Sequence, residues 1–468
     1  MSNNSTVQKR LLTDETGHRI ADALEIMANV RSRILTDFST LQTVLRQGDI
    51  EEYISVGDQI SVEKLASLAV SSSNSGLTVT VNADTFEEAE GEAANRQYEF
   101  EYDGIAWHTD GTIVSLATYG ITVTGTPAEG DLIVVTETAS ELVFDVLAID
   151  YDTPSNPNLT HSLTLGLHDI ASYGAIPFSL KQAFYYAAEA IPANTVCSFS
   201  YPTGISAWGQ VVAGETYYFT PTAEIPAGAQ LVFSGDIYSA KPSTMNVQVF
   251  ANASTTTASA TYPITASGTA TKDLGALNGT DCNHYQRCAY GANRWDYSIS
   301  RMWLNSKAKG AASGVASWYT PQGIYARPVS STLDGWLHGI DPSFVKVLGA
   351  VKKRTSITPF GDAGGYQDTD ETVFLQSMTE VFGSKNNSVA ETSFGTDGTI
   401  KEVAYPYWAA RNTNEDRIKY QGTTARNWWL RTPFPSYSNN ERSVGSSGAL
   451  GNYNASNSIG LVPACVIV

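Results

Sequence analysis

The six histidines are the first residues to test for catalysis or metal binding, because imidazole transfers protons near neutral pH and is the commonest metal ligand. They form no His-Glu-x-x-His pair and no close cluster along the sequence. His161 and His168 lie on what we expect to be separate strand faces, so we do not expect a shared metal. The sequence also lacks a Gly-x-Ser-x-Gly elbow, a phosphate-binding loop and a dinucleotide fingerprint. It therefore predicts a protein that is not an enzyme and needs no cofactor.

Carboxylates and cysteines give no stronger sign of a metal site. An acidic string could coordinate calcium, but it does not match an EF-hand loop, and a solvated turn is the favoured interpretation. Its members are Asp362, Asp368, Asp370 and Glu371. The glutamates within 87–92 are interpreted in the same way. Cys282 and Cys288 could form a local disulfide, but four cysteines are too few and too scattered for a disulfide scaffold, and no zinc spacing is present. No metal is predicted.

The composition limits the class of protein. A chain of 468 residues, of which 42% are hydrophobic, is expected to form two to four well-packed domains. The formal net charge of −18 argues against nucleic acid and against an anionic membrane surface as partners. Met1–Arg10 lacks the apolar run of a signal peptide, and no stretch approaches the ~20 apolar residues of a membrane span. If the protein acts outside the cell, we expect it to leave by another route, of which a virion is one.

The elements that position any site begin with an N-terminal helix. From Thr13 to Gln47 apolar residues recur at steps of three and four, and Gly48 stands where a helix would stop. These residues are Ile20, Leu24, Met27, Val30, Ile34, Phe38, Leu41 and Leu45. We interpret residues 1–48 as an oligomerisation helix that forms a coiled coil, with a homotrimer as the expected state. The alternative is a helix that packs on its own domain.

The rest of the chain has short alternating apolar runs and many turn signals, which predicts an α+β, β-rich fold. The predicted units are the first strands of one domain (49–62 and 143–190), an inserted all-β module of sandwich or immunoglobulin-like type (63–142), a second inserted β module (191–271) and the remainder of the host domain (272–468). Seven of the nine tryptophans lie in the last unit, which is the most informative one.

An ordered set of motifs in residues 272–468 carries a family resemblance. The set comprises Tyr297–Asn305, Trp318–Gln322, Leu337–Pro342, Val351–Thr355, Val373–Gly383, Arg417–Tyr420, Trp428–Pro433 and Gly460–Ile467. It resembles a bacterial and phage domain family of C-type-lectin-like fold, which has a Trp-Trp-Leu-Arg-Ser-Pro strand and a closing Gly-Val-Arg-Pro-Ala strand. Thr432 replaces the usual Ser here, and Leu461-Val462 replaces Val-Arg, which removes one expected buried ion pair or donor. The resemblance implies that Gly57–Ile60, Phe144–Tyr151 and His161–Asp169 are further strands of this domain.

The same fold is shared with the variable proteins of diversity-generating retroelements, of the major tropism determinant type. In those proteins a stretch before the last strand is rewritten at adenines, which converts Asn codons mostly to Ser, Tyr and related codons. Asn, Ser and Tyr occupy fourteen of the twenty-three positions in 436–458. The predicted ligand-binding residues are Ser436, Tyr437, Ser438, Asn439, Asn440, Ser443, Ser446, Ser447, Asn452, Tyr453, Asn454, Ser456, Asn457 and Ser458. The alternative is a plain polar loop or hairpin, since Ser, Asn and Gly are ordinary loop residues.

Such a surface binds without chemistry, because Tyr offers a large rigid contact area and Ser and Asn adapt their hydrogen bonds. Trp428 and Trp429 precede it on a strand, where adjacent side chains point to opposite faces, so at least one of them is core. We expect Arg431 to satisfy buried carbonyl groups. All three are predicted structural supports.

The leading hypothesis is therefore a phage receptor-binding protein at the tail tip or fibre, located in the virion and acting outside the cell. Its expected partners are a host cell-surface protein or glycan and other virion tail proteins. One alternative is a structural baseplate or tail protein with a lectin-like domain that is not diversified, and another is a bacterial surface adhesin. The fold is also shared with formylglycine-generating enzymes, but paired cysteines near the chain end are absent, and Cys465 lies in an apolar strand.

Overall fold

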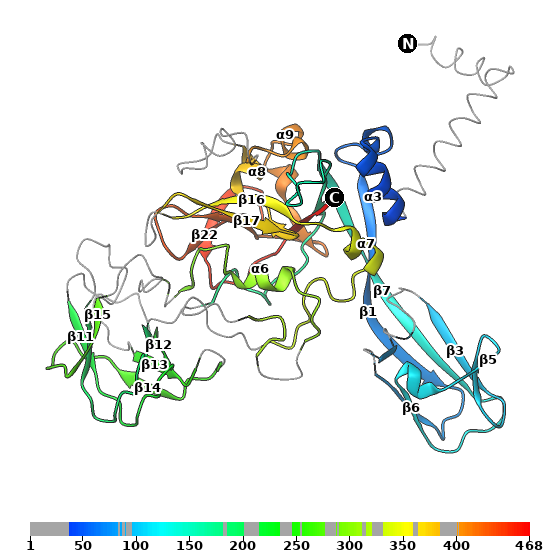
Figure 1. The fold of residues 1–468 in the computed structure, drawn as a ribbon, viewed down its shortest axis with the longest axis horizontal. Helices are drawn as coiled ribbons and strands as arrows, with labels where there is room; N and C mark the ends of the chain where they lie inside the picture. The colour runs from blue at the N-terminus through cyan, green and yellow to red at the C-terminus, as the bar shows by residue number, and fades with distance from the viewer. Residues whose placement is uncertain are drawn as a thin grey trace, which may run out of the picture.

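A computed structural model describes residues 37–468 except 83–84, 87–88, 90–95, 181–184, 201–214, 235–245, 253–254, 277–286, 288–289, 311–314, 321–330, 359–363, 384–399 and 401. Three lobes are visible in Figure 1: a central one, a blue and cyan one at the lower right, and a green one at the lower left. In the described residues, no helix has the length and apolar character needed to cross a bilayer.

The largest sheet has eight strands in the order β18-β24-β8-β7-β3-β4-β5, with β1 also paired to β7, and all of its pairings are antiparallel. Its strands are β1 (Gln59–Ser72), β3 (Gln97–Tyr102), β4 (Trp107–Thr109), β5 (Thr112–Val114), β7 (Leu132–Ile149), β8 (Leu163–Leu167), β18 (Val373–Leu375) and β24 (Pro463–Ile467). Strand β24 is paired on both sides and fully buried, which explains its continuous apolar sequence. The predicted β-rich α+β class is confirmed.

Helix α3 (Phe38–Gln47) packs on this central lobe. Asp37 caps its start by accepting hydrogen bonds from the backbone of Ser39 and Thr40, and Gly48 ends it at φ 84°. The side chains of Phe38, Leu41 and Leu45 are buried in the main core, and the Phe38 ring lies 5.0 Å from that of Phe344. The described end of the predicted coiled coil therefore packs on its own domain, as the alternative expects. Residues 1–36 lie outside the described residues, and oligomerisation through them stays a prediction.

The lower-right lobe corresponds to the predicted first module, residues 63–142. Strands β1 and β7 run without interruption from the central sheet into this lobe, so the predicted boundaries fall inside two continuous strands. The lobe has its own core of Phe86, Phe100, Leu116, Ile121, Ile133 and Val135. That core is covered by the β2–β6 pair (Thr78–Val81, Ile121–Thr124) and by η2 (Leu116–Tyr119). The module is thus an extension of one long ribbon.

The lower-left lobe corresponds to the predicted second module and extends from 185 to 276, beyond the predicted 191–271. It has a sheet in the order β11-β10-β15 and a second in the order β14-β13-β12-β9. The strands are β9 (Tyr185–Tyr186), β10 (Cys197–Ser200), β11 (Thr216–Phe219), β12 (Gln230–Ser234), β13 (Asn246–Phe250), β14 (Ala260–Pro263) and β15 (Lys272–Ala276). Cys197, Phe199, Phe219, Leu231 and Val247 belong to its separate core.

The remaining elements surround one end of the central sheet. They are η1 (Ile50–Glu52), α6 (Ile299–Leu304), α7 (Pro342–Val347), β16 (Val351–Ser356), β17 (Tyr366–Glu371), α8 (Met378–Phe382), α9 (Pro406–Ala410), η5 (Glu415–Arg417), β19 (Lys419–Gln421), β20 (Thr424–Arg426), β21 (Trp428–Pro433), β22 (Asn440–Val444) and β23 (Leu450–Asn454). All seven C-terminal tryptophans are buried in the main core. Large aromatic side chains therefore make up much of the core on which these short elements pack.

Candidate ligand-binding surface

The predicted binding segment is the hairpin β22–β23, which pairs through β22 with β21. Every residue of β21 is buried, and both tryptophans are fully covered although they point to opposite faces of the strand. The Trp428 indole donates to the Arg417 carbonyl at 3.1 Å, and the Trp429 ring lies 5.7 Å from the Phe178 ring. Strand β21 is thus a rigid base for the hairpin, as a supporting role requires.

Arg431 on β21 binds carboxylates as well as the buried carbonyl groups that we expected. Its guanidinium does donate to the Leu375 carbonyl at 2.9 Å, but it also pairs with Glu380 and Glu402 at 2.5 Å each. The Lys353 ammonium pairs with the same Glu380 at 2.6 Å and with Asp152 at 2.5 Å. All five side chains are buried, so the base of the hairpin contains a buried ionic network of three carboxylates and two cations.

Hydrogen bonds from neutral groups complete the network. The Tyr405 hydroxyl donates to Asp152, the Ser377 hydroxyl to Glu402 and the Ser377 backbone to Glu380. Burial alone would raise the pKa of Glu380, but the charges of Arg431 and Lys353 and their hydrogen bonds outweigh it and lower the pKa to about 2. Burial would likewise lower the pKa of Lys353, yet Asp152 and Glu380 raise it above its usual range. Both groups are therefore held in their charged forms.

Thr432 retains the hydroxyl that the resembled family supplies with Ser. Its Oγ1 accepts a hydrogen bond from the Met378 backbone at 2.8 Å, at the start of α8. The first turn of a helix has backbone N–H groups without helical partners, so this bond satisfies one of them. The substitution therefore keeps the contact between β21 and α8.

One face of the hairpin carries a continuous row of amide groups. Asn440 and Asn454 are paired across the strands, and the Asn439 amide donates to both of them at 3.0 and 2.8 Å. The Asn440 amide donates to Asn452 at 3.0 Å. Asn440, Asn452 and Asn454 are half-exposed. Because alternate residues share a strand face, Arg442 belongs to this row as well.

An aromatic pair borders the amides. The rings of Phe434 and Tyr437 stack at 5.5 Å with an interplanar angle of 15°, and the Arg442 guanidinium lies 4.6 Å from the Phe434 ring centre. We call Phe434, Tyr437, Asn440, Arg442, Asn452 and Asn454 the amide face. It combines flat ring area with hydrogen-bonding groups, which suits either sugar hydroxyls or a protein surface. Neither Phe434 nor Arg442 was among the predicted residues, because neither belongs to the Asn, Ser and Tyr set.

A second exposed group, which we call the hairpin tip, combines Ser446 and Ser447 of the turn with Tyr453 of β23, because Ser446 and Tyr453 both bond to Asn427. Tyr453 is 39% exposed, and its hydroxyl accepts from the Asn427 amide at 3.0 Å. The same Asn427 accepts from the Ser446 backbone at 2.6 Å. Ser436, Ser456, Asn457 and Ser458 flank the hairpin, and each is exposed or half-exposed.

Three of the fourteen predicted residues do not reach the surface, which corrects the prediction for them. Ser438, Asn439 and Ser443 are buried. The Ser438 carbonyl accepts from the Arg287 side chain and from the Asn293 backbone, which holds the loop inward. Ser443 is paired with Trp429 of the buried strand β21. These residues support the surface and are not part of it.

The loop that enters the hairpin is held by residues far away in the sequence. The Asn293 side-chain amide donates to the carbonyls of Tyr437 and Asn440 at 2.7 and 2.8 Å. The Thr358 hydroxyl donates to the Pro435 carbonyl at 3.2 Å. These bonds fix the backbone on which Tyr437 is displayed.

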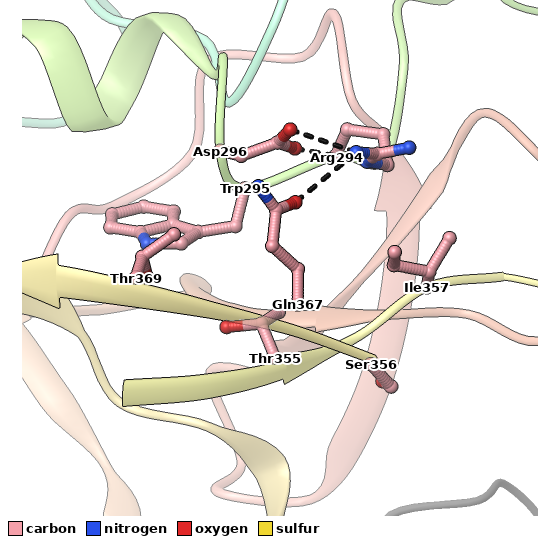
Figure 2. Close-up of a pocket in the computed structure, with 8 residues that line it drawn as sticks. All are labelled: Arg294, Trp295, Asp296, Thr355, Ser356, Ile357, Gln367 and Thr369. Carbon is pink, nitrogen blue, oxygen red and sulfur yellow. Dashed lines mark hydrogen bonds and ion pairs between the residues drawn. The ribbon is translucent and has the colours of Figure 1, made fainter. Parts of the chain in front are cut away.

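A small pocket lies directly beside this loop (Figure 2). Its free volume is about 10 Å³, which is about the space of one water molecule. Figure 2 shows Arg294 reaching Asp296 and Gln367, with its two bonds to the Asp296 carboxylate at 2.9 and 2.8 Å. The Thr369 hydroxyl is buried and has no partner among the described residues. The pocket therefore has room for about one water molecule, or for a single polar atom at the edge of a larger ligand.

The other candidate groups of the sequence are dispersed. His161 pairs with Asp150 and His168 with Asp145, each through Nδ1 at 2.9 Å. No three His, Cys, Asp or Glu residues in the described part of the chain are arranged to hold a metal ion. Cys197 and Cys465 are buried free thiols. Cys282, Cys288, and the glutamates at 87, 88, 90 and 92 lie outside the described residues.

The described members of the acidic string lie on a strand and not in the turn that we expected, and Asp362 lies outside the described residues. Its described carboxylates lie on β17 and contact cations: Asp368 pairs with Arg354 at 2.7 Å, and Glu371 is buried against Arg301 at 2.8 Å. Asp370 lies near Lys352, at 3.8 Å. The β16–β17 pairing places Arg354 opposite Asp368 and Lys352 opposite Asp370, so these two carboxylates stabilise the hairpin, whereas the pair of Glu371 with Arg301 joins β17 to α6.

Comparison with known proteins gives one partial match. Residues 271–468 match the family described as "Domain of unknown function (DUF6273)". No curated protein matches the chain. No solved structure matches it either. The matched range contains β16–β24, the ionic network except Asp152, and the whole of the hairpin surface.

Proposed function

We propose that this chain is a phage virion receptor-binding protein, and that the amide face and the hairpin tip bind a host-surface protein or glycan. The observation that supports this most is the contrast between the hairpin and its base. Strand β21 and the ionic network are buried without exception, while the hairpin above them displays Asn, Ser and Tyr side chains. Rigid placement of adaptable polar groups reduces the entropy lost on binding.

The same contrast supports the diversified, C-type-lectin-like interpretation of 436–458. Replacement of an exposed Asn, Ser or Tyr changes the contacts offered to a ligand and leaves the buried base unchanged. Under this proposal the varying positions are the exposed and half-exposed Asn, Ser and Tyr residues of 436–458, while Ser438, Asn439 and Ser443 stay constant. Sequencing several isolates of the gene tests this directly, and substitutions spread evenly over residues 272–468 would contradict it.

Binding is tested with two variants and a matched control. Tyr437→Ala with Asn452→Ala and Asn454→Ala removes groups from the amide face, and Tyr453→Ala removes the ring at the tip. The control, Thr122→Ala with Thr124→Ala, changes exposed side chains of β6 in the inserted module. Because the altered side chains are exposed or half-exposed, and the buried Asn439 amide keeps its bond to Asn440, we expect melting temperatures near that of the wild type. Attachment to host cells should fall by at least about tenfold in the triple variant, a loss of about 1.4 kcal/mol, and stay unchanged in the control.

A structural role in a tail or baseplate is the second candidate. The two roles differ in what happens to the amide face: receptor binding needs it exposed in the assembled particle, whereas subunit packing would cover it. If the triple variant attaches normally but fails to enter assembled particles, the structural role replaces the receptor-binding role.

A further inference from the structure

The sheet of the inserted module has one covered face and one open face. Phe100, Ile133 and Val135 point into the module core. Alternation along β3 therefore places Glu99 and Glu101 on the opposite side. Cross-strand pairing then puts Glu101, His108 and Ile113 in one row. In Figure 1 this sheet forms the outer part of the lower-right lobe, far from the β22–β23 hairpin.

This open face and the turn at its edge carry the two most exposed large apolar side chains of the described chain. Ile105 is 88% exposed and Ile113 is 68% exposed. Ile113 lies on the edge strand β5, and Ile105 lies in the turn that joins β3 to β4. The neighbouring Leu132 is half-buried on the same face, opposite Glu101. Exposed apolar residues grouped within a polar rim mark interaction sites.

The rim of this face is acidic. An open hollow of about 470 Å³ is lined by Glu99, Glu101, Asp103 and Asp110, together with His108, Gly111 and Leu132. Glu129 lies beside Gly104 at the same end of the module. The His108 ring pairs with Asp103 at 2.7 Å, so its charge is already matched within the face. The remaining carboxylates give the hollow a negative potential.

We propose that the outer face of the 63–142 module, formed by Ile113, Leu132, Glu99 and Glu101 with Ile105 in the turn at its edge, is a docking surface for a partner protein. The partner presents Lys or Arg side chains around an apolar residue. The apolar residue covers the isoleucines, and the cations pair with the carboxylates of the rim. Charge complementarity identifies a basic protein, because a second copy of this chain, with a net charge of −18, would repel the rim. The site is separate from the receptor-binding surface and does not depend on it.

The test uses a random peptide library displayed on yeast and panned against the full chain. We expect the enriched peptides to contain an apolar residue flanked by Lys or Arg. A synthetic peptide of the most enriched sequence is then titrated by calorimetry into three proteins: the wild type, Ile105→Thr with Ile113→Thr, and Glu99→Gln with Glu101→Gln. All four residues are exposed, so far-UV circular dichroism should be unchanged.

Each variant reports on one part of the proposal. The isoleucine variant should weaken binding at least about tenfold at any salt concentration, since it removes the apolar contact. The glutamate variant should weaken it at low salt and lose most of that effect at high salt, because screening reduces the contribution of exposed charges. The matched control is Glu51→Gln with Glu52→Gln, two exposed glutamates of η1 in the central lobe, which should bind as the wild type does.

Three outcomes would overturn the proposal. The first is a panned library without enrichment of basic and apolar sequences. The second is a peptide whose affinity falls equally in the η1 control, which would show attraction to the acidic chain as a whole. The third is self-association of the wild type in sedimentation velocity that disappears in the isoleucine variant, which would identify a second copy as the occupant.

Discussion

Lys352 and Lys353 are neighbours on β16, but one is exposed and the other is buried. Substituting each in turn therefore tests the buried ionic network against a matched control. Lys353 is fully buried between Asp152 and Glu380, whereas Lys352 is exposed and lies 3.8 Å from Asp370. Lys353→Met leaves three buried carboxylates with one cation, so we expect the free energy of unfolding to fall by about 3–5 kcal/mol. Lys352→Met should change it by no more than about 0.5 kcal/mol. Urea unfolding followed by tryptophan fluorescence measures both, and equal losses would contradict the network's role.

The lowered pKa of Glu380 gives a prediction for acid stability. A carboxylate whose pKa is about 2 when folded and near its ordinary value of 4.5 when unfolded binds its proton first in the unfolded chain. Its contribution is therefore complete above a pH of about 4.5 and is lost as the pH falls toward about 2. Asp145, whose pKa is also lowered because Lys419, Gln59 and His168 outweigh its burial, acts in the same direction.

Glu380→Gln separates this contribution from general acid unfolding. The variant is less stable at neutral pH because Arg431 and Lys353 lose a charged partner. Below a pH of about 4.5 its free energy of unfolding should fall less steeply than that of the wild type. Urea titrations at several pH values measure the slopes, and parallel curves would show that Glu380 is not the group responsible.

The turn of the β22–β23 hairpin sets the positions of Ser446 and Ser447. Gly448 has φ 77°, and a Cβ atom there would lie 1.6 Å from the Asn414 carbonyl oxygen. Gly445, in the same turn, would bring a Cβ no closer than 3.4 Å to any atom. Gly448→Ala should therefore cost about 1–3 kcal/mol of stability and displace Ser446 and Ser447 from their places. Gly445→Ala is the control and should change stability by less than about 1 kcal/mol; thermal melts and host attachment measure both.

Local patterns predicted many of the elements but not their extents. The apolar spacing up to Leu45 and the following Gly48 correctly placed the end of α3, because both signals are local. The boundaries of the 63–142 module were missed for a physical reason. Strands β1 and β7 alternate in the same way on both sides of those boundaries, and only the pairing of distant residues shows that they are continuous.

The candidate site could be predicted only in part, for the same reason. Ser438 and Ser436 are the same residue type in the same loop, yet one is buried and the other exposed. The difference arises from Arg287 and Asn293, which bind the loop from about 150 positions away. The ionic network joins residues from 152 to 431, so no sequence window contains it. Residue type indicated a polar surface, and tertiary contacts decide which positions belong to it.

At the scale of the whole molecule, the three lobes have separate hydrophobic cores. The first module joins the central lobe through the β1–β7 ribbon, where Lys64 and Leu65 also bond to Trp336 and Gly339, and it packs its own interior. Units with independent cores can be removed or exchanged without loss of the rest. We therefore expect the two units that carry the proposed binding surfaces to fold independently, so that the loss of one surface leaves the other intact.

A shortened chain tests this separation. Ser67 and Thr138 are paired across the ribbon, so replacing residues 68–137 with Asn-Gly closes β1 and β7 as a two-residue hairpin. We expect the shortened chain to keep the central core, which includes Ile60, Phe144 and Trp336, and to melt cooperatively. It should attach to host cells as the full chain does, because the amide face and the tip are untouched, and it should no longer bind the basic peptide. Loss of attachment in a folded, shortened chain would show that the module contributes to receptor binding, and the two surfaces would then have to be treated as one site.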